Sequence, residues 1–404
     1  MPLKNKLLEL GKKYGTPLYV YDADTVEKRY TELCTSIKWP GVKIFYAMKA
    51  NYNFHILKLL KELGAGIDAV SLGEVILALK AGFNKKDILY TANNISLDEM
   101  KKVYALGVIQ NIDALSSLEM FGKNFPGGKI CVRFNTGIGA GEHDFVITSG
   151  EDSKFGIMLR DLDKVIEISK KYNLKVTGLH EHTGSGIGDT EKIFESMEEL
   201  LDIASIKNFP HLEFIDFGGG FSVPYKPEGK RTDYSLFGDK TVEMFDKFCK
   251  NYGRKLNLYF EPGKYITAEA GFLIVRVNTI KHTENLNIAG TDSGFPHLIR
   301  PVLYNAYHHI WNLSNPNGKT EKYDIYGNIC ESGDFFAKER ELPGIREGDY
   351  LAVLNAGAYC YSMGGVYNLR PMPAEVIIKD GKDFLARRAL SYEELAEKII
   401  EESG

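Results

Sequence analysis

One lysine follows an apolar strand at the start of the chain. It is Lys49, in the stretch YAMKAN from Tyr46 to Asn51. Burial disfavours an ammonium and favours the neutral amine, which is the form that bonds a carbonyl carbon. A lysine that only extends its ammonium into water is the alternative, and residues farther along the chain decide between the two.

Other predicted strands end in residues that suit the same chemistry. They are Ser71, Asp113, Arg133, His182, the triple glycine at 218–220, and Glu261. Glycines after a strand let a phosphate approach backbone N–H groups, although a plain tight turn would also use them. Together with Lys49, these residues predict a phosphorylated cofactor whose carbonyl carbon bonds the lysine.

A histidine pair raises a second hypothesis. His180 and His182 are two residues apart on one predicted strand and so face the same side. The pair fits a metal-dependent barrel hydrolase, but that site needs further ligands on neighbouring strand ends, and the other histidines fall elsewhere. We therefore expect no metal, and interpret His182 as a ring stacked on an aromatic cofactor or as a structural core residue.

Eight predicted strands position these residues. They are 43–50, 66–71, 88–92, 109–115, 129–134, 175–182, 212–220 and 257–263. Segments with helical spacing lie between them, at 55–63, 73–81, 97–105, 161–172, 191–206 and 241–252. This alternation predicts an α/β fold, a (β/α)₈ TIM barrel with its chemistry at the carboxyl ends of the strands. An open doubly wound sheet is the alternative, but it would need a glycine-rich fingerprint after the first strand.

A second domain follows the barrel. Strand patterns at 271–277, 286–289, 323–326, 349–355 and 374–378 predict an antiparallel β domain, with a short helix near 303–310. The strand 16–22 is expected to join it, after a helix at 2–15, and 391–404 is expected to be a charged helix. We place the barrel at 25–268 and the β domain at 1–24 and 269–404. The glycine-rich segment 137–153 is either a mobile active-site loop or disordered.

Composition excludes several function classes. The 404 residues are 44% hydrophobic and 26% charged with a net charge of −4, so we expect a globular protein that acts on small molecules and binds neither nucleic acid nor membrane. The five separated cysteines lack a C-x-x-C pair, which disfavours a disulfide framework or a zinc ribbon and favours the reducing cytoplasm. The first residues lack the apolar core of a signal peptide and no apolar run approaches about 20 residues, so we expect neither export nor a membrane span.

Six ordered motifs resemble the fold type III pyridoxal-phosphate-dependent decarboxylases. They are YAMKAN from Tyr46, HEHTGSG from His180, DFGGGF from Asp216, EPGK from Glu261, CESGD from Cys330 and GAY from Gly357. The segments 298–308 and 361–375 resemble the diaminopimelate decarboxylase group most. The resemblance extends from Tyr14 to Glu375. It implies an alanine racemase-like barrel, the cofactor pyridoxal 5′-phosphate, and conversion of meso-2,6-diaminopimelate to L-lysine, the last step of lysine biosynthesis.

The resemblance also implies residue roles. Lys49 would bond the cofactor aldehyde, and Glu261 would face the pyridine nitrogen, where the related racemases have an arginine. The other implied cofactor contacts are Arg133, His182, Ser185, Gly219, Gly220, Pro262, Gly263, Lys264 and Tyr359. Cys330 would be the catalytic acid, reaching the partner's site in a homodimer with shared active sites. The implied substrate contacts are Lys264, Arg300, Tyr304, Glu331 and Tyr359.

Two departures from the diaminopimelate decarboxylase pattern leave the substrate open. Lys264 stands where arginine is common, and it keeps the charge but loses the bidentate fork. Gly364-Gly365-Val366 stands where Ser-Ser-Asn is frequent. A decarboxylase of ornithine, lysine or carboxynorspermidine is therefore the alternative function. An amino-acid racemase and an inactive cofactor-binding regulator are less favoured, because Lys49, Glu261 and Cys330 are all present.

Overall fold

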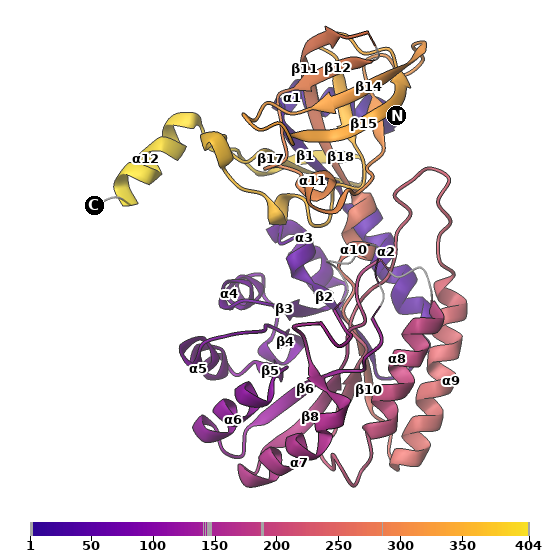
Figure 1. The fold of residues 1–404 in the computed structure, drawn as a ribbon, viewed down its shortest axis with the longest axis vertical. Helices are drawn as coiled ribbons and strands as arrows, with labels where there is room; N and C mark the ends of the chain where they lie inside the picture. The colour runs from indigo at the N-terminus through magenta and orange to yellow at the C-terminus, as the bar shows by residue number, and fades with distance from the viewer. Residues whose placement is uncertain are drawn as a thin grey trace. The chain divides into compact units, whose positions relative to one another are not determined.

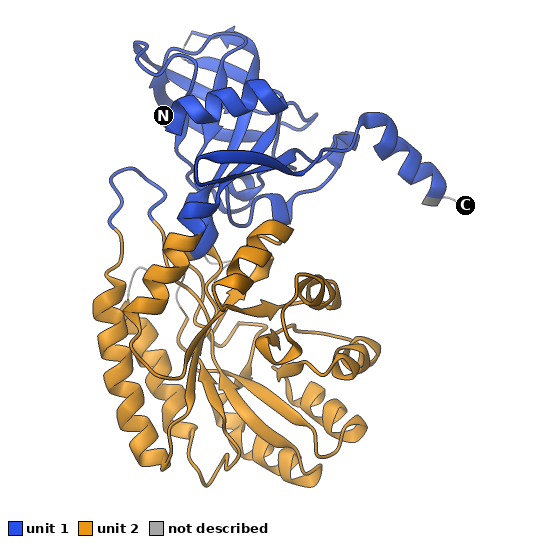
Figure 2. Cartoon of the chain, turned by 180° about the vertical axis from the view of Figure 1, so that it is seen from behind, with its two compact units in different colours: residues 1–26, 224–230, 266–404 blue, residues 27–223, 231–265 orange. Residues whose placement is uncertain are grey.

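The computed structural model describes residues 3–139, 141, 143, 148–186, 190–284 and 286–402. The chain forms two compact units, coloured separately in Figure 2. The barrel unit comprises Glu27–Val223 and Arg231–Tyr265. The β unit comprises Met1–Val26, Pro224–Lys230 and Ile266–Gly404.

Eight parallel strands form a closed ring in the barrel unit, with helices around them (Figure 1). The strands are β2 (Val42–Ala47), β3 (Gly66–Ala69), β4 (Ile88–Tyr90), β5 (Ile109–Ile112), β6 (Lys129–Asn135), β8 (Lys175–His180), β9 (Phe214–Asp216) and β10 (Asn257–Phe260). Pairing of β10 with β2 closes the ring, so the predicted barrel is confirmed and the open sheet is wrong. A two-residue strand, β7 (Ile157–Met158), adds to β6.

The six predicted barrel helices are present. They are α3 (Phe54–Glu62), α4 (Leu72–Lys80), α5 (Leu97–Leu106), α7 (Leu162–Lys171), α8 (Thr190–Ile203) and α9 (Tyr234–Tyr252). The last begins before the predicted Thr241 because Asp233 caps it, accepting from the N–H groups of Ser235 and Leu236. The prediction missed α2 (Ala23–Ser36), α6 (Leu115–Asn124) and the one-turn α10 (Lys264–Thr267).

Aromatic side chains fill the barrel interior. Phe45, Phe214 and Tyr259 pack together, with ring centroids 4.7 Å apart for Phe45–Tyr259 and 4.6 Å for Phe214–Tyr259. Gly178 leaves room for this layer, since a Cβ there would lie 2.1 Å from the Phe214 ring. Because the interior is solid, chemistry is confined to the ends of the barrel.

The β unit is built on a nine-stranded sheet. Its strands are β1 (Leu18–Asp22), β11 (Gly271–His282), β12 (Asn287–Thr291), β13 (Ile310–Asn312), β14 (Thr320–Tyr326), β15 (Phe335–Pro343), β16 (Tyr350–Val353), β17 (Ala374–Lys379) and β18 (Lys382–Arg387). The prediction that β1 joins this sheet is confirmed. The purely antiparallel arrangement is wrong, because β1 pairs in parallel with β17 and β12 with β14.

Three helices belong to the β unit. The predicted terminal helices are present as α1 (Leu3–Tyr14) and α12 (Tyr392–Glu402). The helix expected at 303–310 is instead α11 (Arg300–Tyr304), which ends where Asn305 adopts a left-handed conformation at φ 49°. Among the described residues, no helix combines the length and apolar character needed to cross a bilayer.

The segment 137–153 lies partly outside the described residues, so neither hypothesis about it is tested. Its described end is attached to the barrel. The Thr148 hydroxyl donates to the His182 carbonyl at 2.8 Å, and the Ser149 hydroxyl donates to Asn135 Oδ1 at 2.8 Å.

Candidate active site

Lys49 lies directly after β2, in a single 3-10 turn of residues 48–50. Its Nζ is 2.5 Å from Oδ2 of Asp68 on β3, and its side chain is 35% exposed while that of Asp68 is fully buried. The Thr91 hydroxyl donates to the other Asp68 oxygen. Lys49 therefore lies at the carboxyl rim of the barrel, and the buried Asp68 carboxylate is its counter-ion.

Backbone packing fixes the turn that carries Lys49. The Ala47 N–H donates to the Pro262 carbonyl at 3.1 Å, which joins the ends of β2 and β10. Gly263 makes this approach possible, because a Cβ there would lie 2.9 Å from the Ala50 Cβ and 3.0 Å from the Ala47 carbonyl oxygen. Pro262 and Gly263 thus position the lysine turn.

Glu261 follows β10 and meets His180, the last residue of β8. The distance from His180 Nε2 to Glu261 Oε2 is 3.0 Å, and both side chains are buried. Burial, reinforced by Arg133, lowers the pKa of His180 well below its usual value, so the ring is neutral and its Nε2–H donates to the carboxylate. Burial raises the pKa of Glu261, whereas Lys49 and Arg133 oppose that shift.

Several buried polar atoms at the rim lack a hydrogen-bond partner among the described residues. They include Glu261 Oε1, an acceptor, and Arg133 Nη2, a donor. Buried polar atoms are nearly always paired, so each is suited to a polar group of a ligand. The Arg133 guanidinium itself is held over the Phe155 ring, 4.7 Å from its centroid.

The triple glycine forms the turn between β9 and the following loop. Gly218 and Gly220 have φ of 64° and 99°, which disfavours residues with side chains. A Cβ on Gly219 would lie 2.4 Å from the Glu261 carbonyl oxygen. The Gly219 N–H donates to His182 Nδ1 at 3.1 Å, which fixes the plane of that imidazole.

His182 and Ser71 are placed differently from the prediction. Strand β8 ends at His180, so His182 lies beyond it and its orientation comes from Gly219, because burial lowers the pKa of His182 and leaves Nδ1 free to accept. Strand β3 ends at Ala69, so Ser71 lies beyond the strand and is the N-cap of α4, accepting from the Glu74 N–H. Ser185 lies between Gly184 and Gly186, and residues 187–189 are outside the described chain.

Four of the predicted substrate residues, Arg300, Tyr304, Glu331 and Tyr359, lie in the β unit, whereas Lys264 lies in the barrel unit. Arg300 is buried, with its guanidinium 4.8 Å from the Tyr225 ring centroid and 6.0 Å from that of Tyr304. These cation–π contacts hold the guanidinium in one plane. Tyr359 is half-buried and has a left-handed backbone at φ 56°.

Cys330 lies in a turn that a buried aspartate organises. Asp334 accepts from the N–H groups of Phe295 at 2.6 Å and Ile329 at 2.8 Å. The Cys330 N–H donates to Asn368 Oδ1 at 2.8 Å, and the cysteine and its neighbour Glu331 are exposed. The turn therefore presents a thiol and a carboxylate side by side.

Asp68 and its partner Thr91 were missed by sequence reasoning. The available signal was an acidic residue inside the buried run GIDAV, on the strand next to that of Lys49. In the structure, Asp68 is in register with Ala47. An acid at that position has a clear use as the counter-ion of Lys49.

Asp68 should make the stability of the cofactor-free protein depend on pH. Burial, with the charge of Glu261 added and Lys49 opposing, raises the pKa of Asp68 from 3.8 to about 6. A group with a raised folded-state pKa adds stability that is complete below its unfolded pKa and is lost as the pH rises through the folded pKa. We expect this group to lower the unfolding free energy by about 2 kcal/mol between pH 4 and pH 7.

Urea titrations of wild type and Asp68→Asn across that range measure this dependence. The variant should lack this part of the pH slope, because asparagine does not titrate. Asp98→Asn, which changes a carboxylate with a side chain 74% exposed on α5, is the matched control and should keep the wild-type slope. Equal slopes in wild type and Asp68→Asn would contradict the assignment.

The metal hypothesis can be compared with the geometry. Ligand atoms of His180, Asp216 and Glu261 all lie within 4.8 Å of one another. His182 is not a member of this group, so the predicted His-x-His pair does not form it. Burial and the charge of Glu261 raise the pKa of Asp216 well above its usual value, which favours a neutral acid. This trio is thus better described as a positioning network for Glu261.

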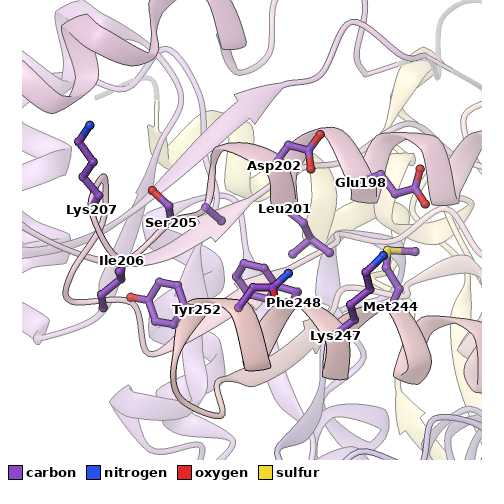
Figure 3. A pocket seen from close by; sticks show the side chains of 12 residues that line it. Glu198, Leu201, Asp202, Ser205, Ile206, Lys207, Met244, Lys247, Phe248 and Tyr252 are labelled. Carbon is purple, nitrogen blue, oxygen red and sulfur yellow. The ribbon is translucent and has the colours of Figure 1, made fainter.

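A cavity of about 470 Å³ lies on the outside of the barrel, between α8 and α9 (Figure 3). Leu201, Phe248 and Tyr252 are among the side chains that line it. Its floor includes residues 204–207, which lead toward the start of β9 and so lie at the end of the barrel opposite Lys49. None of the rim residues lines this cavity, and we do not assign the reaction to it.

The chain resembles known proteins over nearly its full length. Residues 23–268 match the family model described as pyridoxal-dependent decarboxylase, pyridoxal binding domain. A diaminopimelate decarboxylase of Methanothermobacter thermautotrophicus is 42% identical over 396 residues, which is 96% of this chain and 92% of that protein. The one from Aquifex aeolicus is 35% identical and covers 98% of this chain and 94% of its own.

Solved structures give the same result. The crystal structure of diaminopimelate decarboxylase from Helicobacter pylori, complexed with L-lysine, has a TM-score of 0.90 and 30% sequence identity, covering 98% of this chain and 100% of that chain. A lysine/ornithine decarboxylase from Vibrio vulnificus, at 22% identity and TM-score 0.82 over 94% of this chain and 99% of its own, shares the fold.

Proposed function

The chain belongs to the pyridoxal-dependent decarboxylase family, and we propose that its barrel rim converts meso-2,6-diaminopimelate to L-lysine and CO₂. The observation that carries the chemistry is Glu261, a buried carboxylate held by neutral His180 with Oε1 unpartnered among the described residues. A carboxylate there favours a protonated pyridine ring, whereas the arginine of racemases does not. This distinction favours decarboxylation over racemisation.

The rim fits pyridoxal phosphate. Neither Glu261 Oε1 nor Arg133 Nη2 has a hydrogen-bond partner among the described residues, so Glu261 would accept from the ring N–H and Arg133 would donate to a polar group of the cofactor. When bound, the cofactor supplies an electron sink for the pair left by the departing CO₂. We propose that Ser185, Gly220, Gly263 and Tyr359 contact its phosphate and that the His182 ring stacks on its face.

Lys49 and Glu261 then have separate tasks. Lys49 would hold the cofactor through its amine and would lie beside the carbon that loses CO₂. Glu261 would hold a proton at the ring nitrogen, and His180 keeps the carboxylate oriented. The reaction is completed when the carbon that has lost CO₂ gains one proton.

We propose that Cys330 of a partner subunit delivers this proton, so that a homodimer is required for activity. The exposed thiol, on a turn whose backbone N–H groups donate to Asp334 and Asn368, is suited to act on a group outside its own turn. Glu331 beside it and Arg300 would bind the distal ammonium and carboxylate of the substrate, together with Tyr304 and Lys264. Each active site would then combine Lys49 of one chain with Cys330 of the other.

Mixing two inactive variants tests the shared site. Lys49→Ala and Cys330→Ala chains, mixed in equal amounts and allowed to exchange subunits, should recover about a quarter of wild-type activity, because half of the dimers then contain one intact site. The CO₂ release of the mixture measures this. Cys360→Ala, which alters a buried cysteine of the same unit, replaces Cys330→Ala in a parallel control. No recovery after proven exchange would contradict a shared site.

The substrate is tested by CO₂ release from meso-diaminopimelate, ornithine, lysine and carboxynorspermidine. We expect kcat/KM to be highest for meso-diaminopimelate, with L-lysine as product. A Lys264→Arg variant restores the guanidinium fork and should lower KM for a dicarboxylate substrate. Turnover of another substrate with none of meso-diaminopimelate would favour the alternative decarboxylase, whereas CO₂ release from none would contradict the family activity.

We also propose a cytoplasmic location. The five cysteines are all free, two of them, Cys34 and Cys330, outside the buried core, which suits a reducing compartment. Fractionation of cells that produce the protein, followed by activity measurement in each fraction, tests the proposal.

A further inference from the structure

The barrel end opposite Lys49 carries a basic cavity. Its volume is about 430 Å³, and it lies where β6, β8, β9 and β10, four neighbouring strands, begin. Lys129, Lys175, Arg254 and Lys255 line it together with His211, and Glu213 is the one carboxylate among the lining residues. Buried Thr177, Leu212 and Leu256 form its floor.

The strand register brings two of these cations together. Lys129 and Lys175 are the first residues of β6 and β8 and are direct partners in the parallel pairing. Neighbouring strands are about 4.8 Å apart, so two ammonium groups at partnered positions repel each other unless an anion lies between or beside them. The pairing of these strands therefore favours a negative charge near the two lysines.

The carboxylates of the protein supply only part of this negative charge. Glu213 Oε1 is 2.6 Å from Lys129 Nζ, which neutralises one cation. Arg254 is anchored by donating from Nη2 to the carbonyls of Pro210 at 3.1 Å and Leu212 at 2.7 Å, neither of which carries charge. Within the described parts of the chain, no carboxylate forms an ion pair with Lys175, Arg254 or Lys255.

We propose that this basic cavity binds a small multivalent anion through its phosphate or carboxylate oxygens. Lys175 and Lys255 supply charge, and Arg254, preset by its two carbonyl contacts, supplies further N–H donors in a fixed plane. Buried Thr177 and the first residues of the strands form the base of the cavity beneath the anion. The site is at the end of the barrel where the strands begin, opposite the rim that carries Lys49. Binding of the anion should therefore stabilise the fold and leave catalysis unchanged.

Titration calorimetry on the protein loaded with pyridoxal phosphate tests the proposal, since loading fills the catalytic phosphate site. Pyrophosphate and citrate are the probes, and potassium chloride at equal ionic strength is the reference. We expect saturable binding of one anion per chain by at least one probe, and a matching rise in Tm. Lys175→Ala should weaken it about tenfold, because it removes one charge-assisted contact.

Two controls make the result decisive. Lys102→Ala removes an exposed lysine of α5 and should bind as wild type. Lys175→Ala should keep wild-type kcat/KM, which shows that it is folded. Binding of pyrophosphate alone identifies a phosphate site, and binding of citrate alone a carboxylate site. The proposal is overturned if neither probe exceeds the chloride reference, or if Lys175→Ala binds as tightly as wild type.

Discussion

Replacing Lys49 with alanine should lower kcat for CO₂ release at least about 10³-fold. The amine that bonds the cofactor carbonyl is lost, and so is the group that remains beside the reacting carbon. Wild type loaded with cofactor should show an absorbance band of the lysine-bound cofactor, which borohydride removes. The variant should lack this band. Stopped CO₂ assays and absorbance spectra of the same preparations measure both effects.

Lys43→Ala is the matched control for Lys49→Ala. Lys43 is on the same strand, β2, but its ammonium pairs with Asp87 near the start of the strand rather than at the rim. This variant should keep both the band and the turnover. Substantial activity in Lys49→Ala, with the cofactor still covalently held, would show that another lysine has the role.

The second large effect is expected for Glu261→Gln. The amide keeps the shape and can still accept the hydrogen bond from His180, but it no longer stabilises a protonated ring nitrogen. We expect kcat to fall by about 10² to 10³-fold with little change in KM, since the lost charge acts mainly on the transition state. Steady-state kinetics with meso-diaminopimelate measure the split.

A neighbouring variant distinguishes charge from position. His180→Gln keeps a donor near Glu261 Oε2 but changes its reach, so it should reduce kcat less than Glu261→Gln does. Unchanged kcat in Glu261→Gln would contradict the assigned role. A fall in the two variants to the same extent would indicate that the orientation of Glu261, rather than its charge, limits the reaction.

Much of the barrel is predictable because its signals are local. Each strand is a short apolar run followed by a helical period, and strand–helix alternation implies parallel pairing. The β unit lacks such a rule. Whether β1 lies parallel to β17 depends on contacts between residues more than 350 positions apart, and no local pattern encodes that direction.

In the candidate site too, some residues have a local sequence signal and others depend on contacts between distant parts of the chain. Lys49, Arg133 and Glu261 were identifiable because polar residues at strand ends are costly without a use. Their partners were not, because Asp68 and His180 acquire their roles only when neighbouring strands fix the register. The contribution of Cys330 to a partner's site stays a prediction for the mixing experiment.

The most direct test of the account is to locate the cofactor lysine. Protein loaded with pyridoxal phosphate is reduced with borohydride, digested, and analysed by peptide mass spectrometry. We predict that the reduced cofactor is found on the peptide containing Lys49 and on no other lysine, including Lys264 at the same rim. Modification of a different lysine, or none despite stoichiometric cofactor binding, would contradict the proposed site.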